Sequence, residues 1–146
     1  MEQRRIIVGV DGSESSIDAL RYGARLATAF GAPLEAITTW TVPPVAGALL
    51  VEGWSPETDA GVILETSIQQ AFDGAPPAGL RRTTLGGPPA RTLIEVSRDA
   101  EMLVLGSRGH GGFVGLLIGS VSATCAEHAR CPVLIVHSNT EPVQES

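Results

Sequence analysis

The chain has 146 residues and a formal net charge of −6 at pH 7, a length that suits one folded domain. Hydrophobic residues make up 43% and charged residues 18%, a balance typical of globular rather than disordered proteins. All ten basic residues are arginines, and the absence of lysine excludes Schiff-base, P-loop and kinase-type lysine chemistry within this sequence. The acidic balance also argues against non-specific nucleic-acid binding.

The beginning of the sequence has no pattern typical of a signal peptide or a membrane span. Only three large apolar residues, 6–8, stand in a row before Gly9, and no later stretch approaches about twenty apolar residues. Cys125 and Cys131 make neither a zinc set nor a CxxC pair. We therefore expect a cytoplasmic protein with reduced thiols, no membrane contact and no nucleic-acid partner.

Apolar runs alternate with helix-like segments, which is the pattern of repeated β-α-β units. The first run, residues 6–10, is short, β-branched and unbroken, as in a parallel strand buried on both faces. A turn at 11–13 follows it. Ser15 and Asp18 then resemble a capping box, so we expect the first helix to begin there and to end at Gly31.

The later elements continue this alternation, and no internal repeat or second domain is visible. We expect one domain over 1–146, with its core at 4–137 and a disordered tail at 139–146. The third strand is the weakest prediction because it contains two arginines. In chain order we expect a strand at 34–41, a loop at 43–56, a helix at 56–72, a strand at 80–85, a helix after the break at 86–89 with Leu93, Ile94 and Ser97 facing inward, a strand at 102–105, a loop at 107–119, a helix at 121–129 capped by Ser120, and a strand at 133–136.

A glycine-rich run follows the fourth expected strand and precedes a helix. Residues 106–120 hold six glycines in fifteen positions, and glycine lets the backbone approach a ligand closely. The N-terminus of the next helix offers free N–H groups and the positive end of the helix dipole. Ligands of open α/β sheets bind at the carboxyl ends of the strands. The run therefore predicts a phosphate cradle, with the turn at 11–13 as a second loop at the same edge.

Two common phosphate loops do not fit this run. The Gly-Lys-Ser/Thr ending of a P-loop is absent, and Val114 occupies the third glycine position of the dinucleotide fingerprint when the count starts at Gly109. The spacing that fits is Gly106, two residues, Gly109, nine residues, then Gly119-Ser120. This spacing resembles the ATP-binding motif of the universal stress protein family.

The resemblance extends to both ends of the expected core. Residues 7–16 resemble the family's first strand and loop, and residues 131–136 resemble its last strand, so the match covers 4–137. It implies a Rossmann-like α/β fold of the adenine nucleotide alpha hydrolase-like type, with a five-stranded parallel sheet in the order 3-2-1-4-5 and helices on both faces. It also implies ATP as the ligand, with Mg²⁺ left open.

The resemblance places the last strand, Val133–Val136, at the edge of the sheet. All four residues are apolar, and an open apolar edge invites pairing through its free backbone groups. Pairing with the same strand of a second chain gives a two-fold symmetric contact. We therefore expect a homodimer built on this strand.

The family's binding residues carry over onto matching positions. Asp11 matches an acidic residue near the adenine and ribose, and Trp40 falls where the family places an adenine-side contact. The first part of the glycine run matches the loop around the ribose and phosphates, and its end matches the triphosphate-binding start of a helix. The full set is Val10, Asp11, Trp40, Leu105, Gly106, Arg108, Gly109, Gly119, Ser120, Val121 and Ser122.

Several of these residues have a structural alternative. Asp11 could cap the first helix, and Arg108 could be a solvated loop charge. Trp40 could equally be a core residue. Cys125 fits a small core residue. The three histidines are not spaced as metal ligands, so we expect that they do not form a metal site.

Three functions compete on this reading. The first is a nucleotide-binding regulatory protein of the stress response, with at most slow ATP hydrolysis and no catalytic residues. The phosphate cradle and the absence of lysine favour this function. A nucleotidyl transferase on a similar fold would carry His-x-Gly-His near the first helix, where this chain has Asp11-Gly12-Ser13-Glu14. An interaction module that has lost its ligand would not need the complete glycine motif.

Overall fold

The computed structural model of the chain describes residues 4–42, 55–108 and 119–138. The glycine run between Arg108 and Gly119, most of the expected loop at 43–56 and the expected tail at 139–146 lie outside these ranges. No helix in the described ranges combines the length and the apolar character that a membrane crossing needs.

Five parallel strands form one sheet in the order β3-β2-β1-β4-β5, which confirms the expected order. The chain adds strands outward on one side of β1 and then returns to add β4 and β5 on the other side. The direction of winding therefore changes between β1 and β4, and at such a point two neighbouring loops leave the sheet in opposite directions. The strands are β1 (Arg5–Gly9), β2 (Leu34–Trp40), β3 (Arg81–Gly86), β4 (Ala100–Gly106) and β5 (Val133–Val136).

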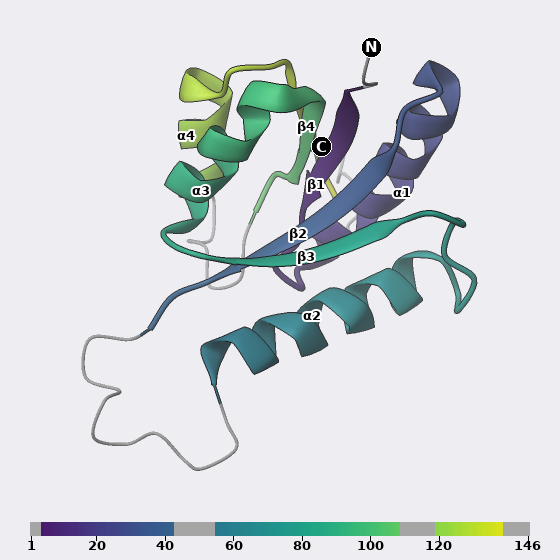
Figure 1. Cartoon of the computed structure of the whole chain (residues 1–146), viewed down its shortest axis with the longest axis horizontal. Coiled ribbons are helices and arrows are strands. Elements are labelled where there is room, and N and C mark those ends of the chain that lie inside the picture. The colour runs from purple at the N-terminus through teal and green to yellow at the C-terminus, as the bar shows by residue number, and fades with distance from the viewer. Residues whose placement is uncertain (1–3, 43–54, 109–118, 139–146) are drawn as a thin grey trace, which may run out of the picture.

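Helices cover both faces of the sheet (Figure 1). One face packs against α1 (Glu14–Phe30) and α2 (Pro56–Ala71), and the other against α3 (Pro89–Val96) and α4 (Ser120–His128). A short 3-10 helix, η2 (Ser97–Asp99), leads from α3 into β4. The elements expected from the sequence are all present, with bounds that differ by one or two residues.

The core consists of two aliphatic layers that the central strand separates. Ile6 and Val8 of β1 point toward α1 and α2, while Ile7 between them points toward α3 and α4, and none of the three is exposed. Burial of one such side chain contributes about 1.5–3 kcal/mol. The unbroken apolar run of β1 is thus explained by burial on both sides, as predicted.

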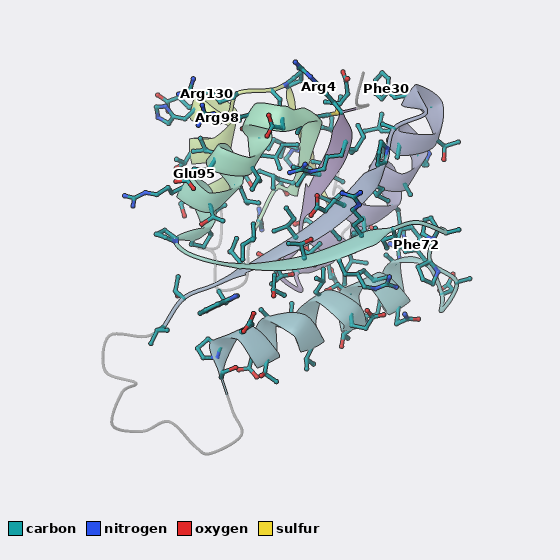
Figure 2. All side chains as sticks on the ribbon, in the orientation of Figure 1. Arg4, Phe30, Phe72, Glu95, Arg98 and Arg130 are labelled. Atoms are coloured by element: carbon teal, nitrogen blue, oxygen red, sulfur yellow. The ribbon has the colours of Figure 1, made fainter. Side chains whose placement is uncertain are left out.

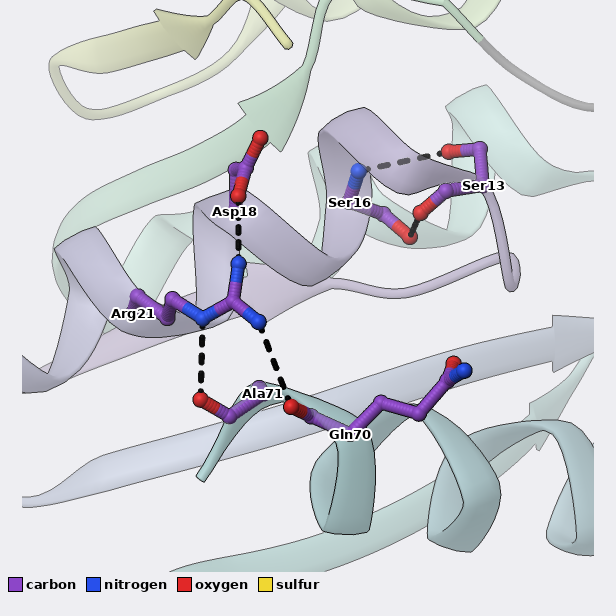
Figure 3. A network of polar contacts seen from close by, with 6 residues as sticks. All are labelled: Ser13, Ser16, Asp18, Arg21, Gln70 and Ala71. Carbon is purple, nitrogen blue, oxygen red and sulfur yellow. Dashed lines mark hydrogen bonds and ion pairs between the residues drawn. The ribbon is translucent and has the colours of Figure 1, made fainter. Parts of the chain in front are cut away.

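The N-cap of helix α1 lies two residues before the expected one. Ser13, in extended conformation, is its N-cap and accepts a hydrogen bond from Ser16 N at 3.3 Å (Figure 3). The prediction that Ser15 caps this helix is wrong, because Ser15 is already helical and buried. The expected end is confirmed: Gly31 has φ +64° and donates its N–H to the carbonyls of the last turn.

Arg21 fixes α2 against α1. Its Nε donates to Ala71 O at 2.9 Å and its Nη2 to Gln70 O at 3.2 Å, while Asp18 Oδ1 lies 2.6 Å from Nη1 (Figure 3). The last carbonyls of a helix have no partner within it, so the guanidinium satisfies groups that would otherwise need water. This contact sets the spacing of the two helices on their face of the sheet.

The arginines that weakened the third expected strand lie on an exposed edge strand. Arg81 and Arg82 are both exposed, and Arg82 Nε lies 2.7 Å from Glu65 Oε1 of α2. The edge position explains why charged residues are tolerated in β3.

Candidate functional site

The candidate site lies where β1 and β4 end side by side. The turn after β1 leads into α1, and the segment after β4 leads into α4, so two helix N-termini begin at the same edge of the sheet. The positive ends of both helix dipoles therefore lie at this edge. An anion is the ligand that such an edge favours.

The two loops are joined by the side chain of Ser15. Its Oγ donates to Arg108 O at 2.9 Å and accepts from Arg108 N at 3.3 Å. Ser15 is only 4% exposed and stands 93 residues from Arg108 in the chain. The first turn of α1 therefore holds the start of the segment that follows β4.

Gly106 allows the two loops to approach this closely. A Cβ at Gly106 would lie 2.6 Å from Ser16 N and 2.7 Å from the carbonyl carbon of Ser15, and it would also meet Ser15 Oγ. Backbone atoms cannot move aside as a flexible side chain can. Gly106 is thus required by the packing of α1 on β4, whatever it contributes to a ligand.

The C-terminal end of the segment between β4 and α4 lies beside its N-terminal end. Gly119 N donates to Ser107 O at 2.5 Å, and Ser122 Oγ of α4 donates to Gly106 O at 2.5 Å. The first amide bonded within α4 is that of Ala123, which donates to Gly119 O. The amides of the three residues before it, 120–122, are therefore those that the helix itself leaves unbonded.

The model of the Universal stress protein family matches residues 2–137. The chain belongs to this family. Two curated members illustrate the likeness. Universal stress protein Rv2623 of Mycobacterium tuberculosis is 30% identical over 138 residues, which cover 94% of this chain and 46% of that protein. A universal stress protein of Mycolicibacterium smegmatis is 30% identical over 136 residues, covering 90% and 45%. The chain thus spans about half the length of these curated relatives.

Solved structures of the family share the fold. A universal stress protein in complex with cAMP has a TM-score of 0.70 and 26% identity, with 95% of this chain and 100% of that chain covered. UspA from Lactobacillus plantarum has a TM-score of 0.74 and 21% identity, covering 93% and 99%. A universal stress protein from Archaeoglobus fulgidus in complex with dAMP has a TM-score of 0.65 and 20% identity, covering 93% and 99%.

Within this family fold, Asp11 occupies the turn between β1 and α1. It is exposed, and its Oδ1 accepts hydrogen bonds from Ser13 N at 3.0 Å and from Ser13 Oγ at 2.5 Å. Asp11 is therefore not the cap of α1 but supports the residue that is. Its Oδ2 has no hydrogen-bond partner in the described part of the chain, so one carboxylate oxygen remains for a ligand.

Three apolar residues of the expected set place their side chains in the core. Val10 and Leu105 are 4% and 3% exposed, and Val121 packs against the layer under α3 and α4. Val10 N donates to Ile37 O at 2.8 Å, and Val10 O accepts from Thr38 Oγ1 at 2.9 Å. The side chains of these three residues therefore shape the edge without facing a ligand, and the backbone groups of Val10 both have partners within the protein.

Trp40 ends β2 at the same edge, two strands from β4. Its indole lies over its register partner Gly86, where a Cβ would be 2.9 Å from Cζ2 of the ring. Its Nε1 is buried and has no hydrogen-bond partner in the described ranges. A buried donor without a partner costs about 1–3 kcal/mol, which is unusual for a purely structural tryptophan.

The remaining expected residues differ in what the structure says of them. Arg108 is exposed, and its guanidinium makes no ion pair with the described residues. Gly119, not Ser120, is the N-cap of α4, so the prediction that Ser120 caps this helix is wrong; Ser120 is its first residue and is exposed. Gly109 and His110 fall outside the described residues. The described residues contain no group of three or more metal-ligand side chains.

Sequence reasoning missed two residues that shape this edge, Ser15 and Ser107. Each uses groups that a sequence pattern assigns elsewhere: Ser15 resembles a helix cap, and Ser107 bonds through its backbone alone. The available signal was the group of three serines at 13, 15 and 16, of which only one is needed as the cap of the helix.

Proposed function

We propose that this universal stress protein binds ATP at the carboxyl ends of β1 and β4 and acts as a regulatory protein, with at most slow hydrolysis. The proposal rests on the contacts that fix the chain after β1 and after β4, where the direction of winding changes. Ser15 holds Arg108, and Ser107 holds Gly119, so the two ends of the glycine-rich segment are fixed beside two helix N-termini. That arrangement suits a group with several negative charges.

The phosphates would lie against α4. The amides of Ser120, Val121 and Ser122, which have no partner within α4, offer donors. Arg108 supplies the positive charge, which a chain without lysine must take from arginine. Gly119 and Gly109 are the other two residues that the motif spacing assigns to the phosphates. Mg²⁺, if it is bound, would come with the nucleotide, since the described residues hold no cluster of carboxylates.

The adenine and ribose would lie toward β1 and β2. Asp11 Oδ2 is a natural acceptor for a ribose hydroxyl. The Nε1 of Trp40, which has no hydrogen-bond partner among the described residues, supports a ligand at the end of β2. The relative at 26% identity, solved in complex with cAMP, supports an adenine nucleotide. The ligand of that relative has one phosphate, so the choice between ATP and a monophosphate must be made by experiment.

Calorimetry on nucleotide-free protein tests the proposal. We expect ATP to bind with a micromolar dissociation constant, about −8 kcal/mol, and GTP to bind more weakly. AMP, ADP and cAMP distinguish a triphosphate site from a monophosphate site, and EDTA tests the dependence on Mg²⁺. Absence of heat with every adenine nucleotide would reject the proposed function. Detection of ADP over time would measure the slow ATPase, which is the alternative reading.

The proposal includes a homodimer and a cytoplasmic location. Among the described strands, β5 pairs with β4 alone and forms the end of the sheet, and Val133, Leu134 and Ile135 are partly exposed. A second copy that pairs with this edge would satisfy its free backbone groups. Both cysteines are free thiols, which suits a reducing compartment.

A further inference from the structure

Ser15 stands out among the buried hydroxyls because both of its hydrogen bonds reach another part of the chain. Its Oγ meets the carbonyl of Arg108 at 2.9 Å and the amide of the same residue at 3.3 Å. One hydroxyl thus uses its donor and an acceptor position on one residue. The helix gains nothing local from these bonds, since Ser13 already provides the cap.

The close packing of β4 against α1 restricts the position of the hydrogen bonds between Ser15 and Arg108. Gly106 brings β4 so close to α1 that a Cβ there would meet Ser16 N at 2.6 Å. Ser122 Oγ ties α4 to Gly106 O at 2.5 Å from the other side. Arg108 therefore leaves β4 from a point that both helices hold, and Ser15 is the side chain that fixes its backbone.

We propose that Ser15 is a positioning residue for the phosphate end of the nucleotide. It acts through Arg108: with both backbone groups held, the guanidinium starts from a fixed point beside the N-terminus of α4. Such pre-organisation lowers the ordering cost that binding would otherwise carry. The inference rests on the proposed nucleotide site, and it predicts that the effect of Ser15 depends on the number of phosphates on the ligand.

The experiment compares Ser15→Ala with the unmodified protein by calorimetry with adenosine, AMP, ADP and ATP. We expect the affinity for ATP to fall about tenfold, the loss for AMP to be smaller, and the affinity for adenosine to change less than about twofold. A purely structural role would instead lower all four affinities by the same factor. Equal losses, or an unchanged affinity for ATP, would overturn the proposal.

Ser97→Ala is the matched control. Ser97 is fully buried, and its Oγ likewise donates to a carbonyl, Ile94 O at 2.6 Å, and accepts from an amide, Arg130 N at 2.9 Å. Figure 2 shows Arg98 and Arg130 near the beginning of β4, at the opposite end of the strand from Gly106. We expect a similar loss of thermal stability and an unchanged ATP affinity. An ATP loss as large as that of Ser15→Ala would contradict the proposal.

A second measurement covers the case in which Ser15→Ala does not fold. Amide hydrogen exchange in the unmodified, nucleotide-free protein should show a protected Arg108 amide, and Ser15→Cys, which keeps a weaker group of similar size, should show less protection. Exchange of Arg108 at the rate of an unstructured peptide would overturn the proposal. Should the unmodified protein bind no adenine nucleotide, the proposed function fails, and the exchange data still decide whether Ser15 holds Arg108.

Discussion

The amide of Ser107 donates to the carbonyl of Val136 at 2.8 Å, which joins the residue after β4 to the last residue of β5. The carbonyl of the same Ser107 accepts the amide of Gly119. Ser107 therefore contacts both the strand proposed for dimerisation and the helix start proposed to bind the phosphates. A change in the pairing of β5 should be felt at the site, and by reciprocity nucleotide should alter the dimer equilibrium.

Ile135→Asp should convert the dimer to a monomer. A carboxylate on the edge strand would have to be desolvated against the same strand of the second chain, or repel its copy there. Light scattering should show the mass fall from twice 15.2 kDa to 15.2 kDa. Ile63→Asp on α2, at a residue that is 38% exposed and away from β5, is the control and should remain dimeric.

Two results would reject this dimer. An unmodified protein with the mass of one chain over a wide concentration range would exclude it altogether. A folded Ile135→Asp variant that is still dimeric would move the interface to another surface.

Gly119→Val should abolish ATP binding and leave the fold intact. Gly119 has φ −69° and ψ 162°, which a β-branched residue adopts without strain, so the backbone itself does not forbid valine here. What remains is steric: the added side chain would occupy the space assigned to the phosphates. Calorimetry and a thermal melt measure the two effects separately, and a variant that binds ATP like the parent would place the phosphates elsewhere.

Gly106→Ala should destabilise the protein by about 1–3 kcal/mol or more, because the new methyl group meets backbone atoms of α1. Gly61→Ala on α2 is the matched change, since a Cβ there meets nothing within 4 Å. It should stabilise by about 0.5–1 kcal/mol through helix propensity. Denaturant unfolding gives both values. Equal effects at the two positions would mean that α1 does not pack on β4 as described.

The thiol of Cys125 should resist alkylation in the folded protein. Burial, with a smaller contribution from Cys131, raises its pKa to about 11 from an ordinary 9.0, so almost no thiolate forms near pH 8. Burial also raises the pKa of Cys131, but that residue is only partly buried and should react first. Peptide mapping after iodoacetamide treatment distinguishes the two.

The same pKa shift predicts a pH dependence of stability. Below about pH 9 the thiol is protonated in both states; between about pH 9 and 11 the unfolded chain releases a proton that the folded chain retains. The free energy of unfolding should therefore fall across this interval. Cys125→Ala should remove that part of the decline, and an unchanged profile would show that Cys125 is not the group responsible.

Local patterns predicted the fold well where burial dictates the sequence. The run at 6–10 could be read as a doubly buried strand because both of its faces are covered by helices. The cap of α1 could not be read in the same way, since Ser13 and Ser15 are both suitable residues. The choice between them depends on a contact 93 residues away, with Arg108, which no local pattern contains.

The structure confirms that the residues expected at the site lie at one edge of the sheet, whereas a bound ligand at that edge stays a prediction. The spacing of glycines points to the edge where β1 and β4 end, whereas the structural reason for Gly106 depends on the backbone of α1 that packs over it. The position of Trp40 against Gly86 follows from the register of β2 and β3, which the sequence does not determine by itself.

The two motif glycines on either side of the cradle should therefore differ in diagnostic value across the family. Gly106 is demanded by helix–strand packing, so a member that has stopped binding nucleotide would still need it, and its presence says little about ligands. Gly119 has backbone angles open to any residue, so nothing in the described contacts forbids its replacement once no phosphate has to fit. A relative that keeps glycine at the position of Gly106 but has a bulky residue at the position of Gly119 is therefore expected to function without a bound nucleotide.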